Sequence, residues 1–171
     1  MTPEHTVKGL FFARFVDEAW ASVAPKLIAP PPNGKYHAFE AYPTSDYLRL
    51  FDRVARARLP AAVREAYRLL ARGEVEVFAG TTLGKVTFSM LGEPGAALLR
   101  YPELSRVLAR GPSVEAVRKG PNRVVITQTS SIGAAEHFAG MLEGIVMAFE
   151  ATPVVHIESS ERRTVTFTVE W

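Results

Sequence analysis

The chain has 171 residues, of which 47% are hydrophobic and 22% charged, and its formal net charge is +2 at pH 7. This length supports one ordinary hydrophobic core, and the composition excludes a disordered segment and a polycation. Because the sequence contains no cysteine, disulfides, thiolate metal sites and a cysteine nucleophile are excluded. We expect one domain over residues 1–171, with a mainly helical lobe at 1–111 and a second lobe at 112–171.

The start of the chain lacks the pattern of an export signal. "MTPEHTVKGLFFARF" has no basic leader followed by an apolar run and a small-residue cleavage site. No stretch approaches the roughly 18 uninterrupted apolar residues of a membrane-spanning helix. We therefore expect a cytoplasmic protein without membrane insertion.

Helical periodicity dominates the first two thirds of the sequence. Apolar residues recur at helical spacing over residues 8–24 and again after Pro43 and Pro60. Between the first two helices, the prolines of 25–43 predict an extended connection whose end pairs as a short edge strand. Thr44 or Ser45 is expected to cap the second helix. "AALLRYPELSRVLARGP" predicts two short helices bent at Pro102.

The last third changes to β-branched runs. "SVEAVRKG" and "RVVITQTS" are joined by "GPN", which predicts a hairpin. A helical stripe follows in "AAEHFAGMLEGIVMAFEA", and "PVVHIESS" with "RRTVTFTVEW" predicts a second hairpin. The last run alternates, so Val165, Phe167 and Val169 are expected on its buried face. The predicted class is α+β, a helical lobe followed by a ββαββ lobe with an antiparallel sheet.

Several of these segments resemble known domains. "VKGLFFARFVDEAW" is similar to the opening helix of heme-nitric-oxide/oxygen-binding domains, "FAGMLEGIVMAFEA" to their long helix near the C-terminus, and "RRTVTFTVEW" to their last strand. "YPTSDYLRLFDRVARARLP" more closely resembles an uncharacterised family abundant in myxobacteria, which looks like a remote cousin of these domains and of four-vinyl-reductase-type small-molecule-binding domains. The resemblance implies a heme-nitric-oxide-binding-like fold with a ligand between the lobes.

The sequence departs from that family at the residues that hold heme. The resemblance places the iron-binding histidine in the helix before the sheet, at or beside Tyr101 and Pro102, and no histidine lies between His37 and His137. The family's Tyr-x-Ser-x-Arg motif is missing from "VVITQTSSIGAAEH". We expect no heme bound through histidine, no metal and no other cofactor; tyrosine can ligate ferric heme, so Tyr101 is the remaining candidate.

No catalytic motif stands out. The four histidines show no metal-ligand spacing, the serines lack a Gly-x-Ser-x-Gly elbow, and "GTTLGK" has the wrong spacing for a phosphate loop. Two or more polar side chains converging in the cleft would be required for an enzyme. We therefore expect a non-enzymatic protein.

Two surfaces remain as candidates for binding. By the resemblance, a small apolar ligand would lie in a cleft between the lobes lined by Phe12, Phe15, Phe78, Leu83, Phe88, Leu98, Leu99, Tyr101 and Leu108; a filled core is the alternative. Arg64, Arg68 and Arg72 recur every four residues as a basic ridge for a protein partner, with a solvated helix face as the alternative and nucleic acid disfavoured. We expect a small-molecule-binding or signalling adaptor domain; the other interpretation is a protein-interaction or dimerisation scaffold, including a homodimer.

Overall fold

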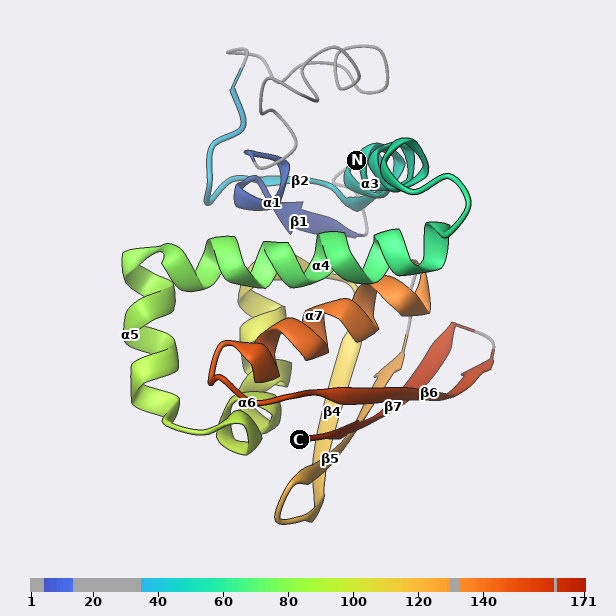
Figure 1. Ribbon diagram of the computed structural model, residues 1–171. Helices are drawn as coiled ribbons and strands as arrows, with labels where there is room; N and C mark the ends of the chain where they lie inside the picture. Colours follow the sequence, from blue (N-terminus) through green and yellow to red (C-terminus); the bar gives the residue numbers. More distant parts are fainter. Residues whose placement is uncertain (1–4, 14–34, 130–132, 162) are drawn as a thin grey trace.

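The computed structural model describes residues 5–13, 35–129, 133–161 and 163–171 (Figure 1). The predicted helix over 8–24 is therefore described only as far as Ala13, and Phe15 lies outside the described residues. The first part of the chain contains helices and three very short strands. They are β1 Thr6–Lys8, α1 Leu10–Ala13, β2 Ala41–Pro43, α3 Thr44–Arg58, α4 Val63–Gly80, α5 Thr82–Leu91, α6 Pro94–Leu108 and β3 Ala109–Arg110.

The second part confirms the predicted ββαββ order. It consists of β4 Ser113–Gly120, β5 Arg123–Thr129, α7 Ala135–Met147, β6 Val154–Glu161 and β7 Thr164–Glu170. The four strands form an antiparallel sheet in the order β4-β5-β7-β6, so the last strand inserts beside β5. Val165, Phe167 and Val169 are buried, as the alternation predicted.

Two local predictions about the helices were wrong. The N-cap residue of α3 is Pro43, and neither Thr44 nor Ser45 caps the helix, because both already lie inside its first turn. Helix α6 runs continuously through Pro102 instead of dividing there. A proline inside a helix removes one hydrogen bond. Leu98 and Tyr101, in the turn that precedes Pro102, are both buried.

A small sheet with the order β2-β1-β3 joins distant parts of the chain. Strand β2 is the predicted edge strand, and it pairs antiparallel with β1, with Val7 opposite Tyr42. Strand β3 pairs with the other edge of β1, so Val7 also lies opposite Ala109. The N-terminal segment is thereby fixed against the end of α6.

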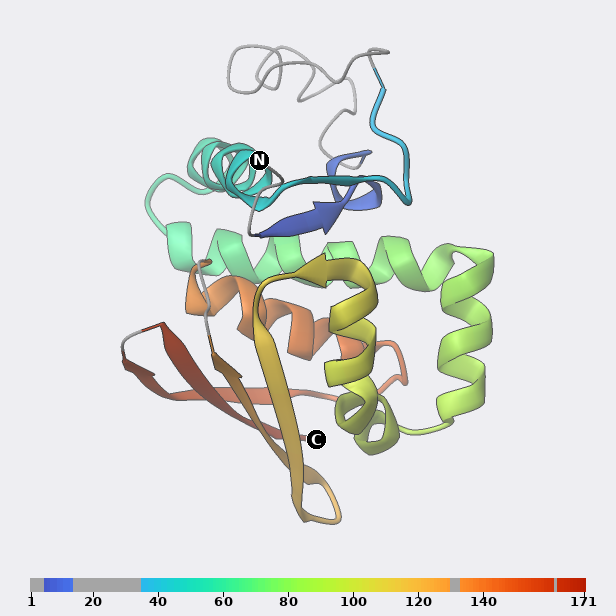
Figure 2. The same ribbon diagram turned by 180° about the vertical axis from the view of Figure 1, so that it is seen from behind.

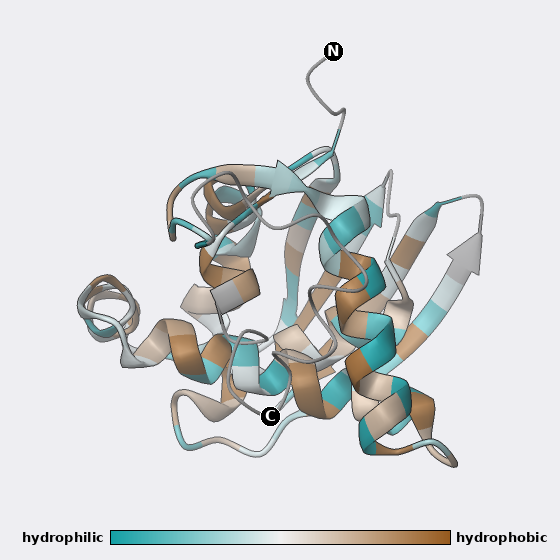
Figure 3. Ribbon diagram, turned by 90° about the horizontal axis from the view of Figure 1, so that it is seen from above, coloured by the Kyte–Doolittle hydropathy of each residue, from teal (hydrophilic) through white to brown (hydrophobic). Residues whose placement is uncertain are grey.

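Helix α4 lies between the N-terminal elements β1, α1 and α3 on one side and α7 on the other (Figures 1 and 2). It contributes residues to two hydrophobic cores. The N-terminal core contains residues of β1, α1, α3 and α4, and its largest fully buried side chains include Phe12 and Phe51. The sheet core contains residues of α6, α7 and the four-stranded sheet, with Phe167 fully buried. In Figure 3 hydrophobic and hydrophilic residues alternate along the helices, as expected for amphipathic helices between core and solvent.

Helices α4 and α7 pack unusually closely. A Cβ atom on Gly140 would lie 2.4 Å from the carbonyl oxygen of Arg68, and one on Gly144 would lie 2.9 Å from the Cβ of Val75. Two glycines one turn apart therefore let the helix backbones approach. Among the described helices, none has the length and apolar character needed to cross a bilayer.

Candidate functional site

A pocket lies where the two cores meet. Its volume is about 80 Å³, and its walls come from β1, α1, α3, α4, α6, β5 and α7. Most of the wall is apolar, with Val7, Phe11, Leu48, Leu108, Phe138 and Met141 among its residues. The polar residues of the wall are His5, Thr44, Tyr47, Glu74, Tyr101, Ser105, Gln128 and His137. An apolar concavity with a few polar groups is typical of a small-molecule site.

Three of these polar side chains form a buried triad. The Tyr47 hydroxyl donates a hydrogen bond to Glu74 Oε1, and it lies 3.1 Å from His137 Nε2. His137 Nε2 is also 3.1 Å from Glu74 Oε2. The three residues come from α3, α4 and α7 and are each at most 5% exposed. The triad therefore cross-links three helices at the edge of the pocket.

The triad geometry assigns the proton on the imidazole of His137. The single hydroxyl proton of Tyr47 is already donated to Glu74, and a carboxylate only accepts hydrogen bonds. Nε2 faces both oxygens, so the proton belongs on Nε2 and is donated to them. The other nitrogen, Nδ1, is buried and has no hydrogen-bond partner among the described residues, and the same is true of His5 Nε2.

Helix α6 contributes one continuous face to the pocket. Tyr101, Ser105 and Leu108 are spaced as neighbours on successive turns, and all three line the pocket. The Ser105 hydroxyl donates to the carbonyl oxygen of Pro102 at 3.0 Å. Burial, with a smaller contribution from the charge of Glu74, raises the pKa of the Tyr101 phenol far above its ordinary value. Tyr101 therefore stays protonated near neutral pH.

The only side chain of the described pocket wall that is charged at every ordinary pH is acidic. Glu74 is the one acidic side chain of the described wall, and no lysine or arginine belongs to that wall. Nowhere in the described ranges do three or more histidine, aspartate and glutamate side chains form a group able to hold a metal ion. These residues are suited to binding a neutral organic molecule.

The structure separates the residues that were expected to share one cleft. Tyr101 and Leu108 line the pocket, whereas Phe12 is fully buried in the N-terminal core and Leu98 is fully buried in the sheet core. Phe88 and Leu99 pack against the sheet core. The ring centroids of Phe78 and Phe88 are 6.2 Å apart. Leu83 is 52% exposed on α5. Thus the observed pocket lies toward the end of α6 rather than along the whole predicted cleft.

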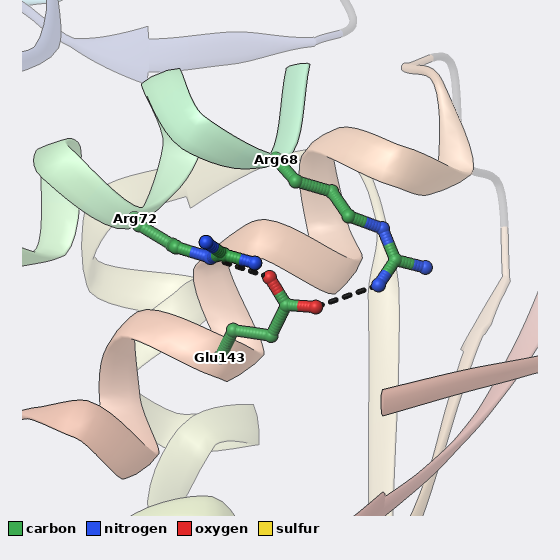
Figure 4. A network of polar contacts seen from close by, with 3 residues as sticks. All are labelled: Arg68, Arg72 and Glu143. Carbon is green, nitrogen blue, oxygen red and sulfur yellow. Dashed lines mark hydrogen bonds and ion pairs between the residues drawn. The ribbon is translucent and has the colours of Figure 1, made fainter. Parts of the chain in front are cut away.

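The basic ridge of α4 faces α7 over part of its length (Figure 4). Arg68 Nη1 donates to Glu143 Oε1 at 2.6 Å, and Arg72 Nε donates to Glu143 Oε2 at 2.7 Å. Glu143 is only 4% exposed. Arg64, whose side chain is 90% exposed, lies 3.5 Å from Glu136. Each arginine of the predicted ridge therefore has an acidic partner within the chain.

Most of the polar residues of the pocket were not predicted from the sequence. Glu74 lies four residues after Leu70 on the buried face of α4. Gln128 follows Val124 and Ile126 at alternate positions, so it continues the buried face of β5. A polar residue at a position where the periodicity predicts an apolar one was the signal that could have identified Glu74 and Gln128. Nothing local marked Tyr47 or His137, whose hydrogen-bond partners lie 27 and 63 residues away.

Solved structures confirm the expected heme-nitric-oxide-binding-like fold. An H-NOX protein from S. oneidensis in the Fe(II)NO ligation state has a TM-score of 0.75 at 13% identity, covering 95% of this chain and 98% of that chain. The H-NOX domain from Shewanella oneidensis in the Fe(II)CO state has a TM-score of 0.74 at 12% identity, covering 96% and 97%. An unliganded Fe(II) H-NOX mutant from K. algicida has a TM-score of 0.72 at 16% identity, covering 95% of each chain.

The sequence itself matches a family whose function its description leaves open. No curated protein matches the chain significantly. The family model described as "Protein of unknown function (DUF2378)" matches residues 1–171, which agrees with the resemblance to an uncharacterised family. The chain therefore belongs to the DUF2378 family and has the fold of an H-NOX domain.

Proposed function

We propose that this chain is a non-enzymatic domain that binds a small neutral molecule in the pocket between its two cores and acts as a sensor or adaptor. The pocket of about 80 Å³, with an apolar wall and a small set of polar groups, is the observation that carries this proposal. The H-NOX-like fold supports it, because the matched H-NOX structures include proteins in the Fe(II)NO and Fe(II)CO ligation states.

Heme itself does not fit the residues of this pocket. Pockets for drug-sized ligands span about 300–1,000 Å³, and a porphyrin is not smaller than such ligands. The pocket here is about 80 Å³ and its described wall contains no arginine or lysine to pair with the porphyrin carboxylates. Tyr101, the candidate axial ligand, is a buried phenol whose raised pKa opposes the phenolate form needed for ferric iron.

The triad supports a structural role over a catalytic one. Three polar side chains do converge at the pocket, which meets the requirement stated above for an enzyme. However, both carboxylate oxygens of Glu74 and the Nε2 proton of His137 are used within the triad. These bonds cross-link three helices, and among the side-chain polar atoms of the triad only His137 Nδ1 has no hydrogen-bond partner in the described part of the chain.

Ligand binding would act on the packing of the two cores. The pocket wall includes Phe11 and Tyr47 from the N-terminal core and Tyr101 from the sheet core. A ligand that contacts both sides favours one arrangement of the cores over others. A partner or a second copy of the chain could then recognise the favoured arrangement.

Two measurements on the purified full chain test this proposal. We expect added hemin to produce no shifted Soret absorption band, and cyclopentanone, a small neutral probe, to raise the melting temperature in a saturable way. A hemin complex with a shifted band would contradict the exclusion of heme. The absence of any thermal shift, together with a mass in solution that rises with concentration, would instead favour the scaffold interpretation.

A further inference from the structure

Two imidazole nitrogens of the pocket wall lack a hydrogen-bond partner among the described residues. They are Nε2 of His5 and Nδ1 of His137, and both residues line the pocket. His137 is the more deeply buried of the two, at 5% exposed. Because a buried polar atom without a partner is unfavourable, such an atom in a pocket wall indicates that a ligand or an internal water completes the site.

The buried triad determines which kind of partner Nδ1 of His137 requires. The ring proton lies on Nε2, because that nitrogen faces the Tyr47 hydroxyl and the Glu74 carboxylate. A neutral imidazole with its proton on Nε2 carries a lone pair on Nδ1. The partner that Nδ1 lacks is therefore a hydrogen-bond donor. Nε2 of His5 can be a donor or an acceptor, depending on its tautomer.

The ring of Phe138 lies between His137 and freedom of movement in the wall. Nδ1 has almost no surface accessible to water, so a donor reaches it only when a neighbouring side chain turns aside. The Phe51 ring, whose centroid is 4.5 Å from that of the imidazole, is fully buried in the N-terminal core. The Phe138 ring, at 5.2 Å, is partly buried and lines the pocket. A change of the Phe138 rotamer is thus the movement that leaves the core intact.

The surroundings of His137 favour a neutral donor over a charged one. A carboxylate offers only acceptors. An ammonium group would donate, but a charge moved into an apolar wall needs a partner, and both oxygens of Glu74 already bond within the triad. A neutral hydroxyl donates without that cost. It can also accept a hydrogen bond, so it suits either tautomer of His5.

We propose that the ligand is a small, mostly apolar molecule with a neutral hydroxyl group that donates a hydrogen bond to Nδ1 of His137. This inference rests on the proposed function, because it requires that the pocket takes a small molecule. It adds the chemical class of that molecule and the atom that recognises it. The volume of about 80 Å³ keeps the ligand small.

Cyclopentanol and cyclopentanone form a matched pair of probes, because they share a ring and an oxygen but only the alcohol donates a hydrogen bond. We expect wild-type protein to bind cyclopentanol at least roughly fivefold more tightly, as measured by titration of the melting temperature. Equal binding, or tighter binding of the ketone, would overturn this inference and leave the proposed function intact. If neither probe binds, the proposed function fails and this inference fails with it.

The variant His137→Gln tests the residue. A glutamine amide can donate to Glu74 in place of the Nε2 proton, but it has no atom at the position of Nδ1. We expect this variant to bind cyclopentanone as the wild type does and to lose the preference for cyclopentanol. His156→Gln, at an exposed position of β6 outside the described pocket wall, should keep that preference. A preference that survives in His137→Gln would overturn the assignment.

Nitrogen-15 NMR of the histidine side chains in the wild-type chain gives the answer even if His137→Gln does not fold. We expect His137 of the free protein to carry its proton on Nε2. Saturation with cyclopentanol, but not with cyclopentanone, should shift the Nδ1 resonance in the direction of an accepted hydrogen bond. A proton on Nδ1 of the free protein, or an Nδ1 resonance unchanged by cyclopentanol, would contradict the proposal.

Discussion

Burial of the Tyr101 phenol makes stability depend on pH on the alkaline side. Its pKa is raised in the folded state above the ordinary value of about 10, first by burial and then by the charge of Glu74. The folded chain thus keeps this proton to higher pH than the unfolded chain. The resulting stabilisation is complete below about pH 10 and is lost as the pH rises through the pKa of the folded state.

We therefore predict that Tyr101→Phe makes the melting temperature depend less on pH in the alkaline range. Between about pH 9 and 11, the melting temperature of the variant should fall less than that of the wild type. Tyr67→Phe should act in the same direction, because burial and then its hydrogen bond to Asp52 raise the pKa of Tyr67. Parallel melting curves for wild type and Tyr101→Phe through this range would contradict the assigned burial.

Individual polar residues were the least predictable part of the site. The sequence identified Tyr101 and Leu108 as cleft residues, and both line the pocket. Glu74 and Gln128 could have been found, because each occupies an apolar position in a helical or alternating pattern. His137 could not, since its role depends on Tyr47, which lies 90 residues away along the chain. Side-chain chemistry of this kind depends on tertiary contacts that periodicity does not encode.

The close contact of α4 with α7 depends on glycine. A Cβ at position 140 would lie 2.4 Å from the Arg68 carbonyl oxygen and 2.7 Å from the Arg68 Cα, both backbone atoms that cannot move aside easily. We predict that Gly140→Ala lowers the free energy of unfolding by roughly 1–3 kcal/mol, the usual range for overpacking. Urea denaturation measures this loss.

Gly80 provides the matched control for that substitution. It ends the same helix α4, and a Cβ there would meet no atom within 4 Å. Gly80→Ala should therefore be neutral or stabilising, by up to about 1 kcal/mol, because alanine is the better helix former. Equal losses for the two variants would show that the helix contact at Gly140 is not the cause.

The buried carboxylate of Glu143 joins the same two helices through charge. It accepts hydrogen bonds from both Arg68 and Arg72. We predict that Glu143→Gln lowers the free energy of unfolding by roughly 1–3 kcal/mol, because an uncharged amide replaces an acceptor that bonds two guanidinium groups. Glu103→Gln is the control. Its pair with Arg100 is about 60% exposed on both sides, so we expect a change within about 0.5 kcal/mol.

A smaller effect of Glu143→Gln than of Glu103→Gln would contradict the role of the buried carboxylate. At high salt the cost of Glu103→Gln should disappear, whereas that of Glu143→Gln should persist, since buried pairs are screened less than exposed ones. Denaturation at two salt concentrations separates the two cases.

Helices and strands with regular periodicity were predictable, and the exceptions have physical reasons. The two hairpins and α7 follow alternating or helical apolar patterns several residues long, so the ββαββ order was correct. Strands β1 and β3 have only three and two residues, too few to show alternation. Continuity of α6 through Pro102 depends on packing against the sheet core, which local propensity does not include.

The fold contains a small pocket between its two hydrophobic cores. Its match to H-NOX structures at 12–16% identity shows that this arrangement of helices and sheet tolerates nearly complete change of sequence. What the residues of this chain leave between the cores is a pocket of about 80 Å³. Such a pocket is large enough for a small molecule or a few waters. Ligand binding should therefore be separable from folding.

Filling the pocket with a larger side chain tests whether ligand binding can be lost while folding is kept. Ser105 is half-buried on α6 and lines the pocket, and methionine is flexible enough to occupy an irregular space and favours helix more than serine does. We predict that Ser105→Met keeps or raises the melting temperature while abolishing the thermal shift caused by cyclopentanone. Ser89→Met, at an exposed position of α5 outside the pocket wall, should leave that shift unchanged. A shift that persists in Ser105→Met would place the ligand elsewhere, because a side chain and a ligand cannot fill one small pocket together.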